Sequence, residues 1–145
     1  MTSDYKNRKY SIVPYDPSWK DLFAVEKEVV GSVFGSTALV VEHIGSTAVP
    51  GMAGKPTIDL LVTVEDISRV DQFNVGMEAL GYEALGEYAA KGARLFVKEE
   101  DGVRLSNIHV FPKGHPHVKE ILDLRNYFLA HPDAVKEYSD LKLEL

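Results

Sequence analysis

The chain of 145 residues contains no cysteine. This absence excludes disulfide bonds, thiolate metal sites and cysteine nucleophiles together. No stretch approaches the ~18 uninterrupted apolar residues of a membrane-spanning helix, so the sequence predicts no membrane partner. No run of lysine and arginine is present either, and the formal net charge is -6. Because contact with nucleic-acid phosphates needs clustered cations, we expect no nucleic-acid partner.

What is present is the composition of an ordinary globular protein, 45% hydrophobic and 26% charged. The segment Met1 to Lys9 is polar and charged and has no apolar region typical of a secretory signal. We therefore expect a cytoplasmic protein. A chain of this length can bury one core, and we expect residues 1–145 to form a single domain.

Hydrophobic spacing and helix-ending residues predict an α+β domain. The expected order is a helix, two strands, a helix, three strands and two helices. The expected strands are Ala38 to Ile44, Thr57 to Val64, Tyr82 to Leu85, Arg94 to Lys98 and Val103 to Phe111. The expected helices run from Asp16-Pro17 to Gly35, from Asp66 to Gly81, from Val118 to Ala130 and from about Asp133 to Leu143.

The most informative segment is residues 43–62, which read HIGSTAVPGMAGKPTIDLLV. A strand ending in Gly45-Ser46 is followed by a loop rich in glycine and proline, and then by an apolar strand that carries Asp59. An ionised carboxylate in a buried strand is costly unless it is paired or binds a metal. Small residues, backbone N–H groups, Lys55 and Asp59 together are what a metal–triphosphate complex would require. The alternative is a simple connection in which a lysine or arginine neutralises Asp59.

Four motifs in order resemble the GrpB family, an uncharacterised family with a fold of the nucleotidyltransferase superfamily. They are residues 13–19 (VPYDPSW), residues 43–62, residues 108–112 (IHVFP), and residues 124–129 (LRNYFL) with His131-Pro132. The resemblance covers nearly the whole chain and implies a mixed, largely antiparallel sheet flanked by helices. It also implies a truncated C-terminal helix, because family members usually continue beyond the position of Leu145. Asn126 stands where the family commonly has aspartate.

The superfamily signature is Gly-Ser followed by a strand with two acids at alternating positions, and a third acid on a later strand. Alternating residues of a strand share one face, so two such carboxylates can hold two Mg²⁺ ions. Gly45-Ser46 and Asp59 match this signature, but the second acidic position is Leu61. The third position would be Asn107 or His109, neither of which is a carboxylate. The acidic metal motif is therefore incomplete, and the sequence leaves open whether the domain is an enzyme.

The resemblance implies binding of a nucleoside triphosphate with Mg²⁺, and transfer of a nucleotidyl group to a small-molecule acceptor. The residues expected to carry this function are Gly45 and Ser46 at the β- and γ-phosphates, Asp59 at the metal, Lys55 and Arg125 at phosphate charge, and His109 as metal ligand or general base.

Each of these assignments has an alternative. Lys55 is equally compatible with plain solvent exposure, and Arg125 with an ion pair to an acid such as Asp59. His43 is either a site residue or a hydrogen-bonded structural histidine. As a whole, the domain is alternatively a catalytically silent module that binds a phosphorylated ligand or a protein partner, which Leu61 favours. A third hypothesis is a metal-dependent hydrolase that uses His43, Asp59 and His109.

Overall fold

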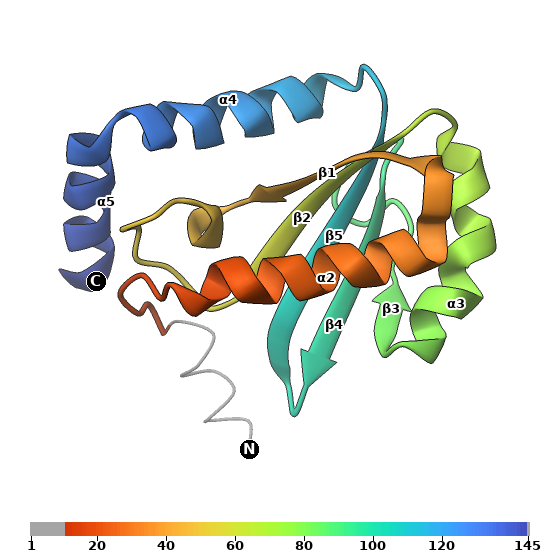
Figure 1. Ribbon diagram of the computed structural model, residues 1–145, viewed down its shortest axis with the longest axis horizontal. Coiled ribbons are helices and arrows are strands. Elements are labelled where there is room, and N and C mark those ends of the chain that lie inside the picture. The colour runs from red at the N-terminus through yellow and green to blue at the C-terminus, as the bar shows by residue number, and fades with distance from the viewer. Residues whose placement is uncertain (1–10, 145) are drawn as a thin grey trace.

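The computed structural model describes residues 11–144 (Figure 1). The segment Met1 to Lys9, in which the sequence indicates no secretory signal, lies outside the described residues. So does Leu145, the position at which the expected helix truncation falls. No helix within residues 11–144 is both long enough and apolar enough to cross a bilayer.

Five strands form one mixed sheet in the order β1-β2-β5-β4-β3. The central pair, β2 and β5, is parallel, whereas the pairs β1–β2, β4–β5 and β3–β4 are antiparallel. The predicted α+β fold with a largely antiparallel sheet is therefore confirmed. The strands are β1 (Ala38–Ile44), β2 (Ile58–Val64), β3 (Tyr82–Ala84), β4 (Arg94–Glu100) and β5 (Val103–Pro112).

The helix α2 (Ser18–Phe34) covers one face of the sheet (Figure 1). Asp16 accepts a hydrogen bond from the Ser18 N–H at 2.9 Å, as expected for a residue that begins a helix. Trp19 and Phe34 are buried in the main core, whereas Leu22 is 49% exposed. Instead Glu26 faces inward and accepts a hydrogen bond from the hydroxyl of Tyr82.

The helices α4 (Pro116–Ala130) and α5 (Pro132–Glu144) follow β5 and meet at His131-Pro132. Ile121 and Leu122 of α4 pack against Leu61 and Phe111 on the face of the sheet opposite α2. Leu124 of the same helix is 60% exposed and lies outside this contact.

The predicted helix from Asp66 to Gly81 is two elements. Residues Ile67–Phe73 form a 3₁₀ helix, and only Asn74–Ala79 (α3) are α-helical. Asp66 caps the 3₁₀ helix, because its side chain accepts a hydrogen bond from the Ser68 N–H at 3.0 Å. Gly81, with φ +95°, ends the segment before β3. Two further 3₁₀ turns, Gly35–Thr37 and Ser46–Ala48, flank β1.

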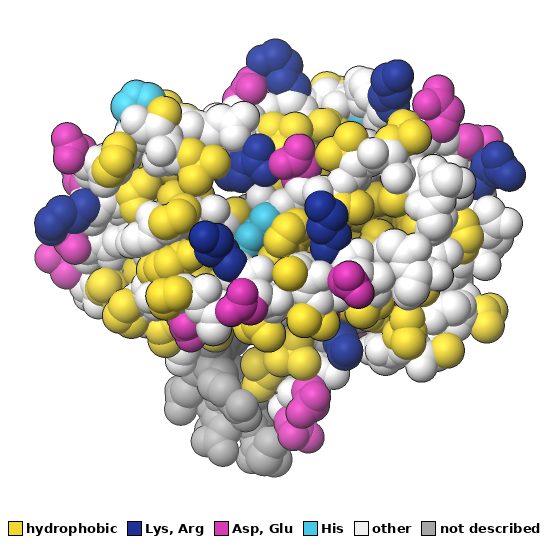
Figure 2. All heavy atoms as spheres, viewed as in Figure 1, with side chains coloured by type: hydrophobic (Ala, Val, Ile, Leu, Met, Phe, Trp, Pro, Cys, Tyr) yellow, Lys and Arg dark blue, Asp and Glu magenta, His cyan; other side chains and the backbone are white. Residues whose placement is uncertain are grey.

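Charges of both signs are interspersed with apolar side chains over the face shown in Figure 2. An anionic ligand would therefore be attracted by particular cationic side chains at its site rather than by an overall positive charge of this surface.

Candidate functional site

Asp59 owes its place to the alternation of side chains along β2. Ile58 and Leu60 contribute to the core beneath α2, so Asp59 and Leu61 face the other side of the sheet. In the parallel pairing with β5, Asp59 lies beside Asn107, and Leu61 beside His109. The register of two neighbouring strands thus brings three polar side chains from different parts of the chain to one place.

The carboxylate of Asp59 is held by groups from β5. Asn107 donates from Nδ2 to Oδ1 of Asp59 at 2.9 Å, and Nε2 of His109 lies 3.6 Å from the same oxygen. Arg104 donates to Oδ1 of Asn107 at 2.7 Å, which fixes the orientation of the amide. Arg104 is itself paired with Glu99 at 2.9 Å. This chain of hydrogen bonds holds one carboxylate oxygen and leaves Oδ2 to face Gly45.

Gly45 allows the carboxylate to approach the backbone closely. A Cβ atom at this position would lie 2.7 Å from Oδ2 of Asp59, and the backbone has φ +78°, a conformation that favours glycine. A similar contact fixes Ser46, since a Cβ on Gly54 would lie 2.6 Å from the Cβ of Ser46. The two glycines therefore seat the Gly45-Ser46 turn directly against Asp59 and the loop that precedes β2.

A pocket of about 570 Å³ opens at this point, and we refer to it as the Asp59 pocket. Its lining includes Ser46, Lys55, Thr57, Asp59, Asn107 and Lys142. Thr57 is held by a hydrogen bond from its hydroxyl to the backbone carbonyl of Arg104 at 3.0 Å. Of the predicted site residues, Ser46, Lys55 and Asp59 line this pocket. Gly45 and His109 lie next to the carboxylate of Asp59 but outside the lining of the pocket.

His43 lies on the other face of the sheet. Its ring stacks on Phe23 of α2 at 4.5 Å between centroids, and its Nε2 is 2.9 Å from the hydroxyl of Thr47. Burial lowers the pKa of His43 to about 4; Asp59 opposes this shift, and Arg125 adds to it. These contacts favour the structural alternative for this histidine.

Arg125 also lies apart from the lining of the Asp59 pocket. Its guanidinium pairs with Glu42 at 2.6 Å and donates to the backbone carbonyl of His43 at 3.1 Å. The acid that neutralises Arg125 is therefore Glu42 rather than Asp59. In this position the residue ties α4 to β1.

The donor set suits one Mg²⁺ ion better than two. Mg²⁺ is commonly held by one or two carboxylates together with phosphate oxygens and water, and Asp59 could supply one carboxylate of this kind. Within residues 11–144 no group of three or more His, Asp or Glu side chains is arranged to hold a metal. Leu61, at the second acidic position, is only 1% exposed. A site with two ions bridged by carboxylates does not fit these residues.

Two basic residues near the site were not predicted, Lys142 of α5 and Arg104 of β5. Lys142 donates to the hydroxyl of Ser46 at 3.2 Å across 96 positions of sequence. No local pattern signals such a contact, because it depends on how α5 docks. Arg104 lies three residues before Asn107 and supports it through the strand geometry of β5.

The family model described as GrpB protein matches residues 9–145. The UPF0157 protein YqkA of Bacillus subtilis (strain 168) is 40% identical over 141 residues, which are 97% of this chain and 41% of YqkA. The crystal structure of the conserved protein GrpB from Enterococcus faecalis superimposes with a TM-score of 0.88 at 33% identity, covering 92% of this chain and 81% of that one.

More distant similarities involve larger proteins. The Cid1 poly(U) polymerase structure has a TM-score of 0.52 at 15% identity over 87% of this chain and 39% of Cid1, a likeness of fold alone. A protein of Mycobacterium bovis named dephospho-CoA kinase is 30% identical over 157 residues. That region covers 92% of this chain and 39% of the kinase, so this chain spans about two fifths of YqkA and of the kinase.

Proposed function

The chain belongs to the GrpB family and has a nucleotidyltransferase-like fold, and from this premise we propose that it binds a nucleoside triphosphate with one Mg²⁺ ion in the Asp59 pocket. The observation that carries the proposal is the placement of one fixed carboxylate beside the Gly45-Ser46 turn, in a pocket that Lys55 and Lys142 also line. Cations, a hydroxyl and a carboxylate around one cavity match the charges of a metal–triphosphate complex.

In this proposal each residue has a role that its contacts support. Asp59 would hold the metal, because Asn107 fixes one of its oxygens and the other faces the turn. Ser46 would contact the phosphates at the turn, and Lys55 would neutralise their charge from the pocket wall. The Mg²⁺ ion, when bound, would neutralise part of the triphosphate charge and orient it.

We propose binding without efficient turnover. Transfer through two metal ions needs a second carboxylate on the face of Asp59, and that position is the buried Leu61. An extended proposal adds transfer of the nucleotidyl group to a small-molecule acceptor. In that form His109, 3.6 Å from Asp59, would accept the proton of the attacking hydroxyl group.

A second candidate is a silent domain that binds a phosphorylated ligand without a metal. It is favoured by Asn107, which stands beside Asp59 where a further acid would be needed for strong metal binding. The similarity to a protein named dephospho-CoA kinase makes dephospho-CoA a reasonable test ligand.

The test is isothermal titration calorimetry, with thermal unfolding in parallel, using ATP, UTP, dephospho-CoA and inorganic triphosphate with and without Mg²⁺. A ligand present at about 100 times its Kd adds about 2.7 kcal/mol to the free energy of unfolding. We expect Asp59→Asn to abolish the Mg²⁺-dependent part of binding. It should cost only about 1 kcal/mol of stability, because the new amide keeps an oxygen that can accept the hydrogen bond from Asn107.

The matched control is Asp123→Asn, which removes an exposed carboxylate paired with Lys119 on α4. It should leave every affinity unchanged. Binding that is equal with and without Mg²⁺ and unaffected by Asp59→Asn would favour the metal-free candidate. Release of pyrophosphate by the unmodified protein, dependent on Asp59, would contradict the proposal of binding without turnover.

A further inference from the structure

Lys142 reaches the Asp59 pocket from α5, the last helix of the described chain. In Figure 1, α5 stands at the end of the sheet beside the loop that joins β1 to β2. The ammonium group donates to the hydroxyl of Ser46 at 3.2 Å and to the carbonyl oxygen of Ala53 at 2.9 Å. It also lies 4.4 Å from the ring centroid of Tyr138.

The charge of Lys142 is not neutralised by any carboxylate within residues 11–144. Its partners there are two uncharged oxygens and an aromatic ring. By contrast, Arg104 is paired with Glu99 and Arg125 with Glu42. Burial lowers the pKa of Lys142, which shows that the surroundings disfavour its charge. An anion in the pocket would supply the missing countercharge.

The position of Lys142 is fixed by the docking of α5. Ser139, one turn earlier, accepts a hydrogen bond from the Ala53 N–H at 3.0 Å and is buried. Val135 packs against Val49 and Met52 of the same loop. Because the helix is anchored at successive turns, Lys142 is held in place before any ligand arrives, which lowers the entropic cost of binding.

We propose that Lys142 and Ser46 together anchor the terminal phosphate of the ligand. The two groups are 3.2 Å apart, so one phosphate oxygen can contact both. This inference rests on the proposed function and narrows it. The recognised group is the phosphate chain, so inorganic triphosphate binds without a nucleoside.

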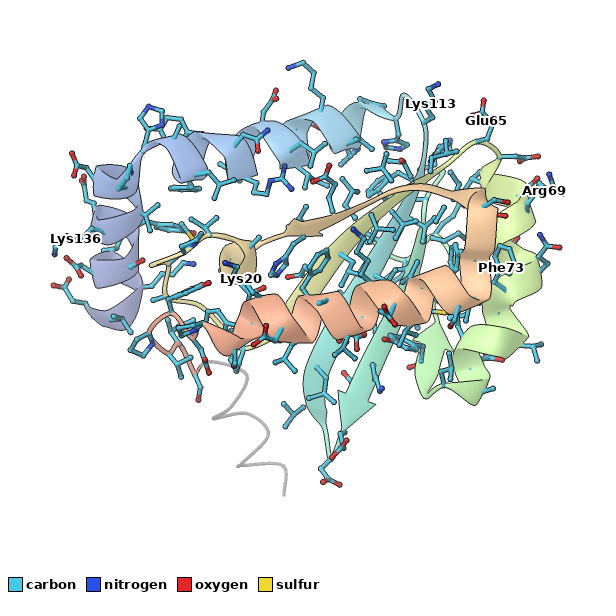
Figure 3. All side chains as sticks on the ribbon, in the orientation of Figure 1. Lys20, Glu65, Arg69, Phe73, Lys113 and Lys136 are labelled. Carbon is cyan, nitrogen blue, oxygen red and sulfur yellow. The ribbon has the colours of Figure 1, made fainter. Side chains whose placement is uncertain are left out.

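The experiment measures the Kd of inorganic triphosphate by titration calorimetry for the unmodified protein, Lys142→Met and Lys136→Met. Lys136 is the matched control, because it lies on the outer side of the same helix, 80% exposed and paired with Asp140 (Figure 3). We expect Lys142→Met to weaken binding at least about tenfold, equivalent to about 1.4 kcal/mol. Lys136→Met should change the Kd less than about twofold, since an exposed charge is well screened.

A second measurement uses the unmodified protein and does not depend on the folding of any variant. The rate of acetylation of each lysine is followed by mass spectrometry with and without triphosphate. Lys142 should be protected by the ligand, whereas Lys136 should not. The rate at Lys136 is the internal reference for reagent activity.

The outcomes separate the two proposals. If the unmodified protein binds triphosphate but neither Lys142→Met nor acetylation responds, the role of Lys142 is wrong and the proposed function stands. If neither triphosphate nor any nucleotide binds the unmodified protein, both proposals are wrong. Weakened binding by Lys142→Met, with protection of Lys142, supports both.

Discussion

Two single substitutions would each add a second carboxylate to the sheet face of Asp59, and we predict opposite results. Leu61→Asp places the acid two residues along β2, and Asn107→Asp places it on β5 directly beside Asp59. The first position is 1% exposed and packs against Ile44 and Phe111, whereas Asn107 lines the pocket.

Leu61→Asp should cost much of the stability of the fold. Loss of a buried leucine side chain costs about 2–3 kcal/mol of transfer free energy. A buried carboxyl group without a partner adds at least about 1–3 kcal/mol. The sum, about 3–6 kcal/mol, is a large part of the 5–15 kcal/mol typical of a natural domain. Burial should also raise the pKa of the new acid, and Mg²⁺ should not restore the stability.

Asn107→Asp should fold and gain affinity for Mg²⁺. The guanidinium of Arg104, which donates to Oδ1 of Asn107 at 2.7 Å, would favour the new carboxylate. The hydrogen bond from Asn107 to Asp59 is replaced by repulsion between like charges, at a cost of about 1 kcal/mol. A divalent cation relieves that repulsion, so stability should rise on adding Mg²⁺.

The assay is urea unfolding of both variants and of the unmodified protein, with and without Mg²⁺, followed by calorimetric titration of the metal. A Leu61→Asp protein with unchanged stability and a new response to Mg²⁺ would refute the placement of residue 61 in the core. An Asn107→Asp protein that is indifferent to Mg²⁺ would refute the view that the identity of this side chain limits metal binding.

Three further predictions concern single side chains. Gly45→Ala should cost about 1–3 kcal/mol in thermal unfolding and displace Asp59. Gly86→Ala should cost less, because its φ is +61° but a Cβ there would meet no atom within 4 Å, and equal costs would contradict the role of the Asp59 contact. Burial lowers the pKa of His43 from 6.5 to about 4, so the unfolded chain binds the proton more readily than the folded protein, and the free energy of unfolding should fall by up to about 3 kcal/mol as the pH drops through this range. The variant His43→Gln should lack this component of the pH profile. Tyr82→Phe should cost about 1–3 kcal/mol in chemical unfolding, because the buried carboxyl of Glu26 loses its donor; no loss would mean that water or another group replaces the hydroxyl.

Local sequence patterns predict most of the helices and strands, because these elements depend mainly on residues that are close in sequence. Strand β1 has the predicted bounds, and the resemblance anticipated the mixed sheet. The inward position of Glu26 could not be predicted from hydrophobic spacing, since its burial depends on Tyr82, which lies 56 positions later. A spacing pattern treats every glutamate as a surface residue.

The candidate site likewise combines residues that are close in sequence with residues that only packing brings together. The motif indicated Gly45, Ser46 and Asp59, which are close in sequence and meet at one turn. The proximity of Asn107 to Asp59 depends on the register of two strands that are distant in sequence, and Lys142 arrives through the docking of the last helix. Such relationships arise from packing, so no short stretch of sequence encodes them.

The order of strands leaves β1 and β3 at the two borders of the sheet, where exposed backbone groups can recruit a strand from another molecule and start aggregation. Both edge strands have features that limit such pairing. Strand β3 has only three residues, and the pairing of β1 is irregular between Ala38 and Val40. Arg125 further occupies a backbone carbonyl of β1 and pairs with the charged side chain of Glu42 on that strand. The ion pair between α4 and β1 therefore occupies part of this border as well as holding the helix in place.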